Sequence, residues 1–257
     1  MSYDNLFIDK KAIKSGNMVE VWEYERPSFR RPPVKSKFAM PYSDEERERW
    51  TKKNKMNSFH RMLRLVTQNF QGVNSYFITL TFKDNVQFVE EANKQFKLFI
   101  QRLRRKLKKD IKYIATIEFQ DKSGRGAVHY HMLANTGFIK NTDLYEVWGQ
   151  GYVRINRVKD TMHAASYAGK YMKKGIYDAR LAGKKSFFCS QNLSRPLELI
   201  NGKVDKLLEA IKEVEKVTYT DTTYESEYNG QIAYKKYFLS ETLTIEAPKT
   251  IVAGSSD

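Results

Sequence analysis

The chain has 257 residues, enough for one large domain or for a core domain with appendages. It carries 45 lysine and arginine residues against 30 aspartate and glutamate residues, a formal net charge of +15. The excess is concentrated in residues 71–200, with 23 basic and 11 acidic side chains, whereas residues 201–257 are slightly acidic. A basic block of this size favours a polyanionic substrate, nucleic acid first, and the alternative is a solvated basic surface.

Several classes of protein are excluded by what the sequence lacks. The single cysteine, Cys189, rules out an intramolecular disulfide and a cysteine-rich zinc framework, and it fits a reducing, intracellular compartment. No apolar run approaches the ~18 residues of a membrane span, and the N-terminus does not read as a signal peptide. The G-x-x-x-x-G-K-[ST] loop of NTPases and helicases is also missing. We therefore expect a cytoplasmic protein without a membrane segment or a motor.

Residues 1–70 are expected to form a basic N-terminal arm followed by a helix. Residues 1–41 contain four of the six prolines together with several arginines, a composition that favours extended, irregular structure. Within them, residues 19–24 alternate and could be a strand. Ser43 and Glu46 have the spacing of a capping box, which predicts a helix over roughly 44–70. Its expected apolar side consists of Trp50, Phe59, Met62, Leu63 and Val66.

Residues 71–200 are expected to form the core domain. The patterns predict a strand at 76–82, a helix at 89–107, strands at 111–119 and from 127, a helix capped by Thr142 that runs to 148, a strand at 152–158 and a helix at 160–174 that stops at Gly175. The two middle strands form a hairpin. The first six elements follow the ferredoxin-like split βαβ plan, so the fold class is α+β, an antiparallel sheet backed by helices.

Residues 201–257 are expected to extend this core with a helix and a β-hairpin. The helix is predicted over 204–217, and strands over 219–228 and 232–239 flank the turn signal Asn229-Gly230. This extension could be an added β-layer, an oligomer contact or an origin-reading module.

Two histidines one residue apart, His129 and His131, are the first candidate site. Strand side chains alternate with period 2, so both imidazoles point to one face while Tyr130 faces the other. Glu118 lies on the paired strand, where a hairpin register could bring its carboxylate beside them, with Asp121 as the reserve ligand. Two imidazoles and a carboxylate suit a divalent ion that acts as a Lewis acid on a phosphoryl oxygen. The alternative is two ordinary strand histidines and a solvent-facing glutamate.

A tyrosine- and lysine-rich helix is the second candidate. Tyr167, Lys170, Tyr171 and Lys174 are three or four residues apart, so they share one face of a helix. A phenol with its pKa of roughly 10 is a poor nucleophile unless a cation or a metal stabilises the phenolate, and these lysines could do so. The alternative is an amphipathic helix that packs its tyrosines.

Three segments in order resemble the motifs of the HUH endonucleases: Ile78–Phe82, His129–His131 and Tyr167–Tyr171. They look most like rolling-circle replication initiators of small phages and plasmids, and the Y-x-x-K-Y spacing is similar to the two-tyrosine motif of microvirus A proteins. Residues 187–196 also look like the F-x-x-S-x-x-L-x-x-P stretch that follows the nuclease in bacterial and phage initiators. The resemblance covers about residues 75–197.

The resemblance implies the HUH nuclease fold and metal-dependent nicking of single-stranded DNA at a replication origin, which leaves a 5′-phosphotyrosine and a free 3′-OH. His129, His131 and Glu118 would hold Mg²⁺ or Mn²⁺. Tyr167 would be the first nucleophile and Tyr171 the second, used to close and release the product circle. Lys170 would orient the attacked phosphate or stabilise charge.

The implied partners are single-stranded origin DNA and the helicase and polymerase of a bacterial host. The basic side chains expected to bind this DNA are Arg102, Arg104, Arg105, Lys106, Arg125, Lys173 and Lys174. Three alternatives remain at this point: an HUH transposase, a non-catalytic module like the RNA-binding RRM domains, and a structural zinc protein with His163 as a further ligand.

Overall fold

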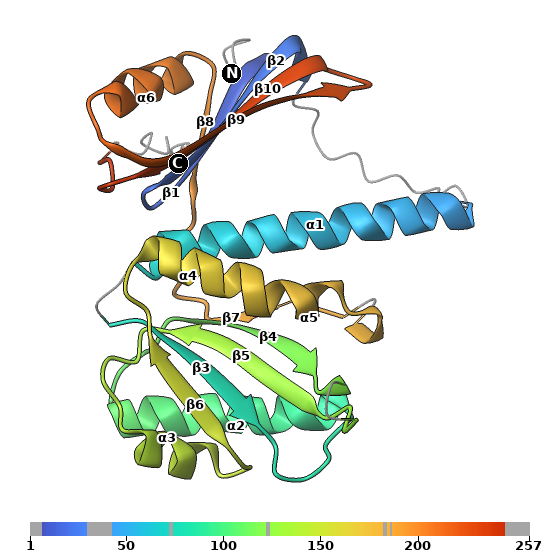
Figure 1. Ribbon diagram of the computed structural model, residues 1–257, viewed down its shortest axis with the longest axis vertical. Helices are drawn as coiled ribbons and strands as arrows, with labels where there is room; N and C mark the ends of the chain where they lie inside the picture. Colours follow the sequence, from blue (N-terminus) through green and yellow to red (C-terminus); the bar gives the residue numbers. More distant parts are fainter. Residues whose placement is uncertain are drawn as a thin grey trace, which may run out of the picture. The chain divides into compact units, whose positions relative to one another are not determined.

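The computed structural model of the chain describes residues 7–29, 43–71, 74–121, 124–181, 184–185 and 187–244. The fold is α+β, with two antiparallel five-stranded sheets, as predicted (Figure 1). The chain divides into two compact units. We call Lys35–Arg195 the site unit, and Met1–Val34 together with Pro196–Asp257 the terminal unit. This division joins both ends of the chain, whereas the sequence suggested three consecutive segments at 1–70, 71–200 and 201–257.

The sheet of the site unit confirms the ferredoxin-like plan. Its elements are β3 (Tyr76–Thr81), α2 (Val89–Leu107), β4 (Tyr113–Phe119), β5 (Val128–Ala134), α3 (Asn141–Trp148) and β6 (Val153–Arg157), with the short β7 (Phe188–Cys189) at one edge. The strand order is β6-β3-β5-β4-β7, and every pairing is antiparallel. The predicted hairpin is the pair β4 and β5.

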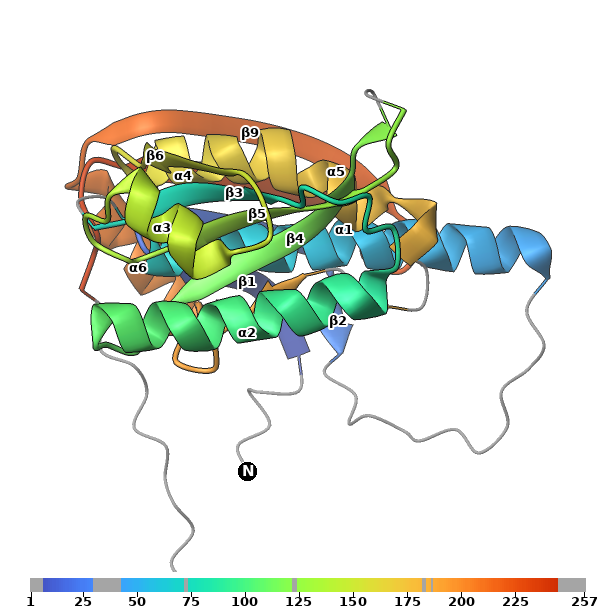
Figure 2. The same cartoon turned by 90° about the horizontal axis from the view of Figure 1, so that it is seen from below.

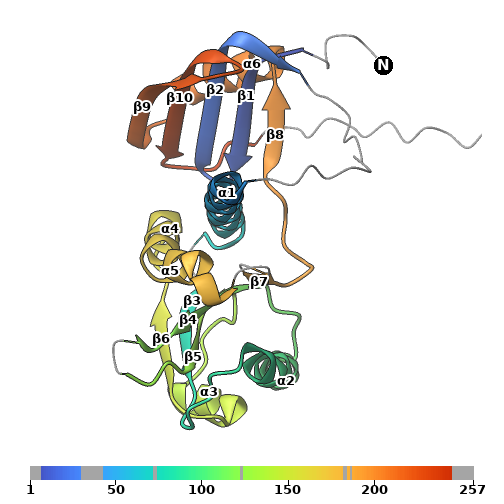
Figure 3. The same ribbon diagram turned by 90° about the vertical axis from the view of Figure 1, so that its right-hand side faces the viewer.

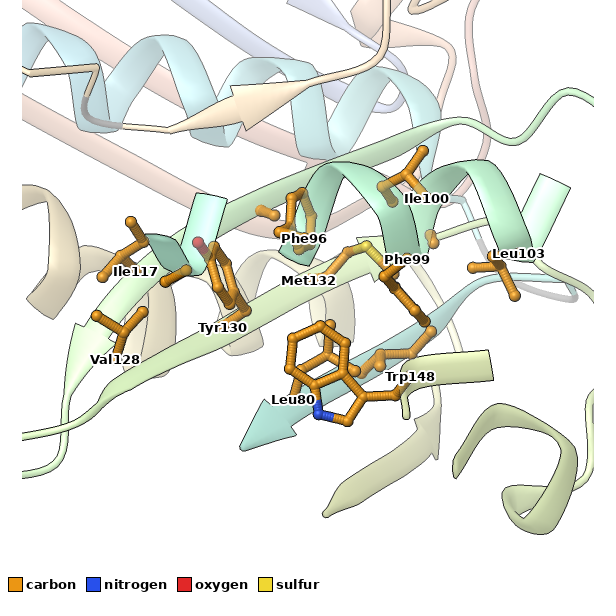
Figure 4. Close-up of a cluster of buried hydrophobic side chains, with 14 of the residues drawn as sticks. Leu80, Phe96, Phe99, Ile100, Leu103, Ile117, Val128, Tyr130, Met132 and Trp148 are labelled. Carbon is orange, nitrogen blue, oxygen red and sulfur yellow. The ribbon is translucent and has the colours of Figure 1, made fainter. Parts of the chain in front are cut away.

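One face of this sheet forms the main hydrophobic core with α2 and α3, which lie in front of the sheet in Figure 2. The apolar stripe of α2 packs on alternate strand residues, among them Leu80, Tyr130 and Met132, all fully buried (Figure 4). Trp148 at the end of α3 is also fully buried, and its indole nitrogen donates to the carbonyl of Thr81. The expected cap of α3 is wrong, because the helix begins after Lys140 without a side-chain cap.

The opposite face of the sheet carries the tyrosine helix (Figures 1 and 3). This helix consists of α4 (Thr161–Tyr167), the π-helix η3 (Ala168–Met172) and α5 (Lys173–Tyr177), followed by the 3-10 turn η4 (Ala179–Leu181). It packs with the C-terminal half of α1 (Asp44–Asn69) over a second apolar cluster. The helix does not stop at Gly175 as expected. Gly175 instead lets it approach β4, because a Cβ there would overlap the carbonyl oxygen of Ile117.

The start of α1 confirms the predicted capping box. The Ser43 hydroxyl accepts from the backbone N–H of Glu46, while the Glu46 carboxylate accepts from the backbone N–H of Ser43. Met62 and Val66 are buried as expected, but Trp50 is 54% exposed and is not part of a buried side. No described helix is long and apolar enough to cross a lipid bilayer.

The terminal unit contains a five-stranded sheet, in which the sequence predicted the C-terminal hairpin and the possible strand at 19–24 but not the strands at residues 7–15 and 197–200. Its strands are β1 (Phe7–Ser15), β2 (Met18–Phe29), β8 (Leu197–Ile200), β9 (Lys216–Ser226) and β10 (Gly230–Leu239), and α6 (Gly202–Lys212) packs on it. The order is β8-β1-β2-β10-β9. The possible strand at 19–24 is confirmed as part of β2, whereas the irregular structure expected for the rest of residues 7–29 is wrong, and residues 30–41 lie outside the described part. The Asn229-Gly230 hairpin is confirmed, since Gly230 has a φ of 65° and β9 pairs with β10.

The close approach at Gly175 gives a prediction. Gly175→Ala should destabilise the site unit by roughly 1–3 kcal/mol, because the added methyl group forces the helix away from β4. The matched control is Gly169→Ala in the same helix, where a Cβ meets nothing within 4 Å and alanine should be neutral or stabilising. Urea denaturation of both variants measures the difference, and equal stabilities would contradict the packing described here.

Candidate active site

The candidate site is built by the register of three strands on the face below the tyrosine helix. Directly opposite residues of antiparallel strands point to the same face of a sheet. One row across the sheet therefore contains Thr81, His129 and Glu118 on β3, β5 and β4. The next row contains Thr79, His131 and Thr116 on the same strands. The structure thus brings together the two histidines and the glutamate that the sequence singled out.

Two threonine hydroxyls orient the imidazoles. Thr81 Oγ1 lies 3.1 Å from His129 Nδ1, and Thr79 Oγ1 lies 3.3 Å from His131 Nδ1. For His129, a proton on Nδ1 that is donated to Thr81 leaves Nε2 with a lone pair for a ligand, whereas Nε2 of His131 donates to the Glu118 carboxylate. Both threonines belong to the segment Ile78–Phe82, but no role for them was predicted from the sequence. Their alternation with the buried Ile78 and Leu80 was the available signal, because it places polar groups on the histidine face.

Glu118 is shared between a histidine and a lysine. Its Oε2 lies 2.6 Å from His131 Nε2, while its Oε1 accepts from the ammonium group of Lys174 on α5. The pKa of Glu118 is lowered from 4.5 to about 2, mainly by the hydrogen bond with His131 and also by Lys174. These contacts outweigh the partial burial of the carboxylate, which acts in the opposite direction. Glu118 is therefore a carboxylate at neutral pH, with both oxygens directed at nitrogen atoms.

His129 lies in an environment that disfavours its charged form. Burial, reinforced by the neighbouring His131, lowers the pKa of His129 from 6.5 to about 4. The two ring centroids are 4.7 Å apart. At neutral pH His129 is therefore a neutral imidazole, which is the form that binds a metal ion.

Tyr171 is the phenol nearer to the histidines. Its ring centroid lies 5.6 Å from that of His131, and the Lys170 ammonium group lies 5.1 Å from the Tyr171 ring. Tyr167 instead packs on Phe77 at 4.6 Å and on His163 at 4.6 Å. Tyr167 is the last residue of α4 and Tyr171 lies within the π-helix, and their rings stack at 5.5 Å. The resemblance implies that Tyr167 acts before Tyr171. In the structure it is Tyr171, not Tyr167, that lies closer to His131.

His163 does not join the histidine pair. Its backbone N–H donates to the Asp160 carboxylate that caps α4, and its Nδ1 accepts from the backbone N–H of Lys159. The neutral ring therefore carries its proton on Nε2 and cannot accept a proton from Tyr167 there. Its position gives no support to the structural zinc site in which His163 would be a further ligand.

The donor atoms fit a divalent ion in kind. Two imidazole nitrogens and a carboxylate converge, and the buried Thr116 hydroxyl opposite His131 has no hydrogen-bond partner among the described residues. As they stand, no three His, Cys, Asp or Glu side chains in the described ranges are arranged to hold a metal ion. In this arrangement His131 and Lys174 take up both carboxylate oxygens of Glu118.

Several residues expected near the site have other partners. The reserve ligand Asp121 binds Arg180 through both carboxylate oxygens, at 2.8 and 2.7 Å. Arg125 donates to the carbonyls of Phe82, Lys83 and Asp84. The Lys173 ammonium lies over the rings of Phe59 and Tyr177. Of the seven predicted DNA-binding residues, Lys174 is the one that contacts the site.

The cations of α2 lie on the helix that covers the other face of the sheet. Arg102 donates to the carbonyls of Val147 and Trp148, Arg104 pairs with Asp110 at 3.0 Å, and Lys106 lies 3.4 Å from Asp143. The contacts of Arg102 and Lys106 connect α2 to α3, and the ion pair of Arg104 connects α2 to the residue Asp110 beyond its C-terminal end. Arg105 lies on the same helix. A role of these four residues in DNA binding stays a prediction, but the structure does not bring them to the histidines.

The low pKa of His129 predicts a dependence of stability on pH. Between about pH 6.5 and pH 4 the unfolded chain takes up a proton that the folded state excludes, so the free energy of unfolding should fall by on the order of 2–3 kcal/mol. His129→Gln should lack this part of the fall. Glu118 acts in a lower window, between about pH 4.5 and 2, where its protonation destabilises the fold. Urea denaturation at several pH values in EDTA measures both, and parallel curves for the two proteins would contradict the assignment.

A comparison with protein families gives one result for this part of the chain. Residues 75–176 match the family described as Replication-associated protein ORF2. The matched segment contains His129, His131, Glu118 and both tyrosines, although it covers only about two fifths of the chain. No curated protein and no solved structure was found to match. The family match supports a replication initiator of the Rep type, with a role in the start of replication.

Proposed function

We propose that the chain cuts and rejoins single-stranded DNA at a replication origin, with a tyrosine of the tyrosine helix as the nucleophile. The observation that carries this proposal is the position of Tyr171, whose ring lies 5.6 Å from His131 on the face where His129 and Glu118 converge. A phenol, two imidazoles, a carboxylate and lysines suit phosphoryl transfer. The match of residues 75–176 to a replication-associated family supports the same reaction class.

The reaction is a transesterification in which a tyrosine Oη forms a bond to phosphorus and the bond from phosphorus to O3′ breaks. The phenolic proton is transferred, directly or through water, to the departing O3′, which becomes the free 3′-OH. The 5′ phosphate stays on the tyrosine until a 3′-OH attacks it in the reverse direction. Lys170, 5.1 Å from the Tyr171 ring, supplies a positive charge that would attract the phosphate.

His129, His131 and Glu118 are the residues that would hold Mg²⁺ or Mn²⁺. The bound ion would supply Lewis acidity, which draws electron density from the attacked phosphate. Thr79 and Thr81 orient the imidazoles, and the close approach of the helix lets Lys174 neutralise Glu118.

A non-catalytic module of the RRM type has less support. RRM domains stack bases on aromatic side chains of a sheet face that is open to solvent. In the site unit the central aromatic residues are covered, since Phe77 is 2% exposed and Tyr130 is fully buried. Helices pack on both faces of the sheet.

The two tyrosines should differ in a cleavage assay. With an origin oligonucleotide and Mn²⁺, Tyr171→Phe should remove most of the covalent protein–DNA adduct, because phenylalanine keeps the ring and deletes only the nucleophilic oxygen. Tyr167→Phe should still nick the strand and should lose circle closure over a full replication cycle. Tyr177→Phe on the same helix is the control. Denaturing gels and peptide mapping of the adduct measure this, and an adduct on neither tyrosine would refute the proposed function.

Removal of the candidate metal ligands should separate cleavage from binding. His129→Ala or His131→Ala should abolish cleavage and weaken Mn²⁺ binding by roughly 10-fold or more, while salt-sensitive DNA binding persists because it depends on lysine and arginine. EDTA should have the same effect on the unmodified protein. Calorimetry with Mn²⁺ and DNA-binding titrations provide the readouts, and His60→Ala on α1 is the control. Full cleavage by metal-stripped protein would contradict the metal role.

A further inference from the structure

The histidine rows of the site continue onto the edge strand β6. The backbone N–H of Thr81 donates to the carbonyl of Tyr152 at 2.8 Å, and Arg154 pairs with Thr79. The first row across the sheet is therefore Tyr152, Thr81, His129 and Glu118, and the second begins with Arg154. Val153 and Ile155 pack into the core on the other face, so the alternation of β6 directs Tyr152 and Arg154 to the histidine face.

Both side chains are open to solvent. Tyr152 is 67% exposed, and Arg154 is also exposed. Neither the Tyr152 hydroxyl nor the Arg154 guanidinium has a side-chain partner among the described residues. The tyrosine helix begins after the C-terminal end of β6, as Figure 1 shows, and its main contacts with the sheet are with β4. The exposed side chains of Tyr152 and Arg154 thus form a surface at the sheet edge, which we call the shelf, beside the rows that contain His129 and His131.

We propose that Tyr152 and Arg154 form a binding subsite for the single-stranded DNA that enters the active site, with a base stacked on Tyr152 and a phosphate bound by Arg154. The proposal rests on the proposed function for the identity of the polymer. Stacking on an exposed aromatic ring beside a cation is how proteins hold single strands without reading sequence. Adjacent pairs in the strand rows are about 5 Å apart, so a strand bound on this shelf reaches the histidines within a few nucleotides.

The chain provides controls for both residues. Arg157 is an exposed arginine on the same strand, but the alternation of β6 directs it to the opposite face. Tyr145 is 50% exposed on α3, which covers that opposite face. Tyr152→Ala and Arg154→Ala can therefore be compared with Tyr145→Ala and Arg157→Ala, and urea denaturation checks that all four fold alike. Tyr152→Phe separates the ring from the hydroxyl.

Binding is measured in EDTA, so that cleavage does not contribute. The probes are a labelled oligothymidylate of roughly 15 nucleotides and an abasic sugar–phosphate strand of the same length. Wild-type protein should prefer the strand that carries bases. Tyr152→Ala should weaken binding of oligothymidylate roughly 5- to 100-fold and lose most of that preference, whereas Tyr152→Phe should keep both. Arg154→Ala should weaken both probes alike and reduce the slope of log affinity against log salt by about 1.

Equal binding by Tyr152→Ala and Tyr145→Ala, or an unchanged preference for bases in Tyr152→Ala, would overturn the subsite. So would an Arg154→Ala salt slope equal to that of Arg157→Ala. The proposed function fails in a different way, when wild-type protein binds origin DNA yet forms no covalent adduct with Mn²⁺. If the protein forms the adduct but its DNA binding is unchanged by Tyr152→Ala and Arg154→Ala, the proposed function stands and the subsite is refuted.

Discussion

The antiparallel register of β3, β5 and β4 determines which side chains meet at the candidate site. A shift of one residue in β5 would place His129 and His131 in the apolar core between the sheet and α2, and it would place Tyr130 on the face that carries the tyrosine helix. Burial prevents this shift, because Tyr130 and Met132 are fully buried in that core and pack against the stripe of α2. The packing on one face of the sheet thus fixes the polar chemistry on the other.

The tyrosine helix is held to this sheet by one close approach and one ion pair. Gly175 allows the helix backbone to reach the carbonyl of Ile117, and its neighbour Lys174 binds Glu118. The Lys174 ammonium group therefore lies where the donor atoms would favour a positive ion. One cation therefore already balances the charge of Glu118, and it belongs to the same helix that carries both phenols.

The sequence predicted the elements of the site unit well because its signals are local. The alternation of β4 and β5, the stripe of α2 and the capping box of α1 are each contained within one or two dozen residues. The histidine pair and Glu118 followed from the same alternation. The register that joins Tyr152 to Thr81 pairs segments about 70 residues apart, and no local pattern reports it.

Three structural features could not be predicted from local sequence patterns. Only residues 19–24 showed a strand pattern within residues 7–29, because the other partners of β1 and β2 are β8 and β10 near the C-terminus. The π-helix at Ala168–Met172 has no distinct sequence pattern, so the tyrosines were placed one α-helical turn apart. The cations of α2 were expected near DNA on charge alone, yet the pairing of Arg104 with Asp110 and the bonds of Arg102 are tertiary contacts.

The sheet of the terminal unit has a consequence for synthesis of the protein. β1 and β2 are synthesised before the other elements described here, but β2 finds its neighbour β10, and β1 its neighbour β8, only after about 180 to 220 further residues have been made. The site unit is complete by then, so the hairpin of β1 and β2 remains with both outer edges unpaired. An isolated hairpin is marginal in water, and its open edges are the part of the nascent chain most exposed to mispairing with other strands.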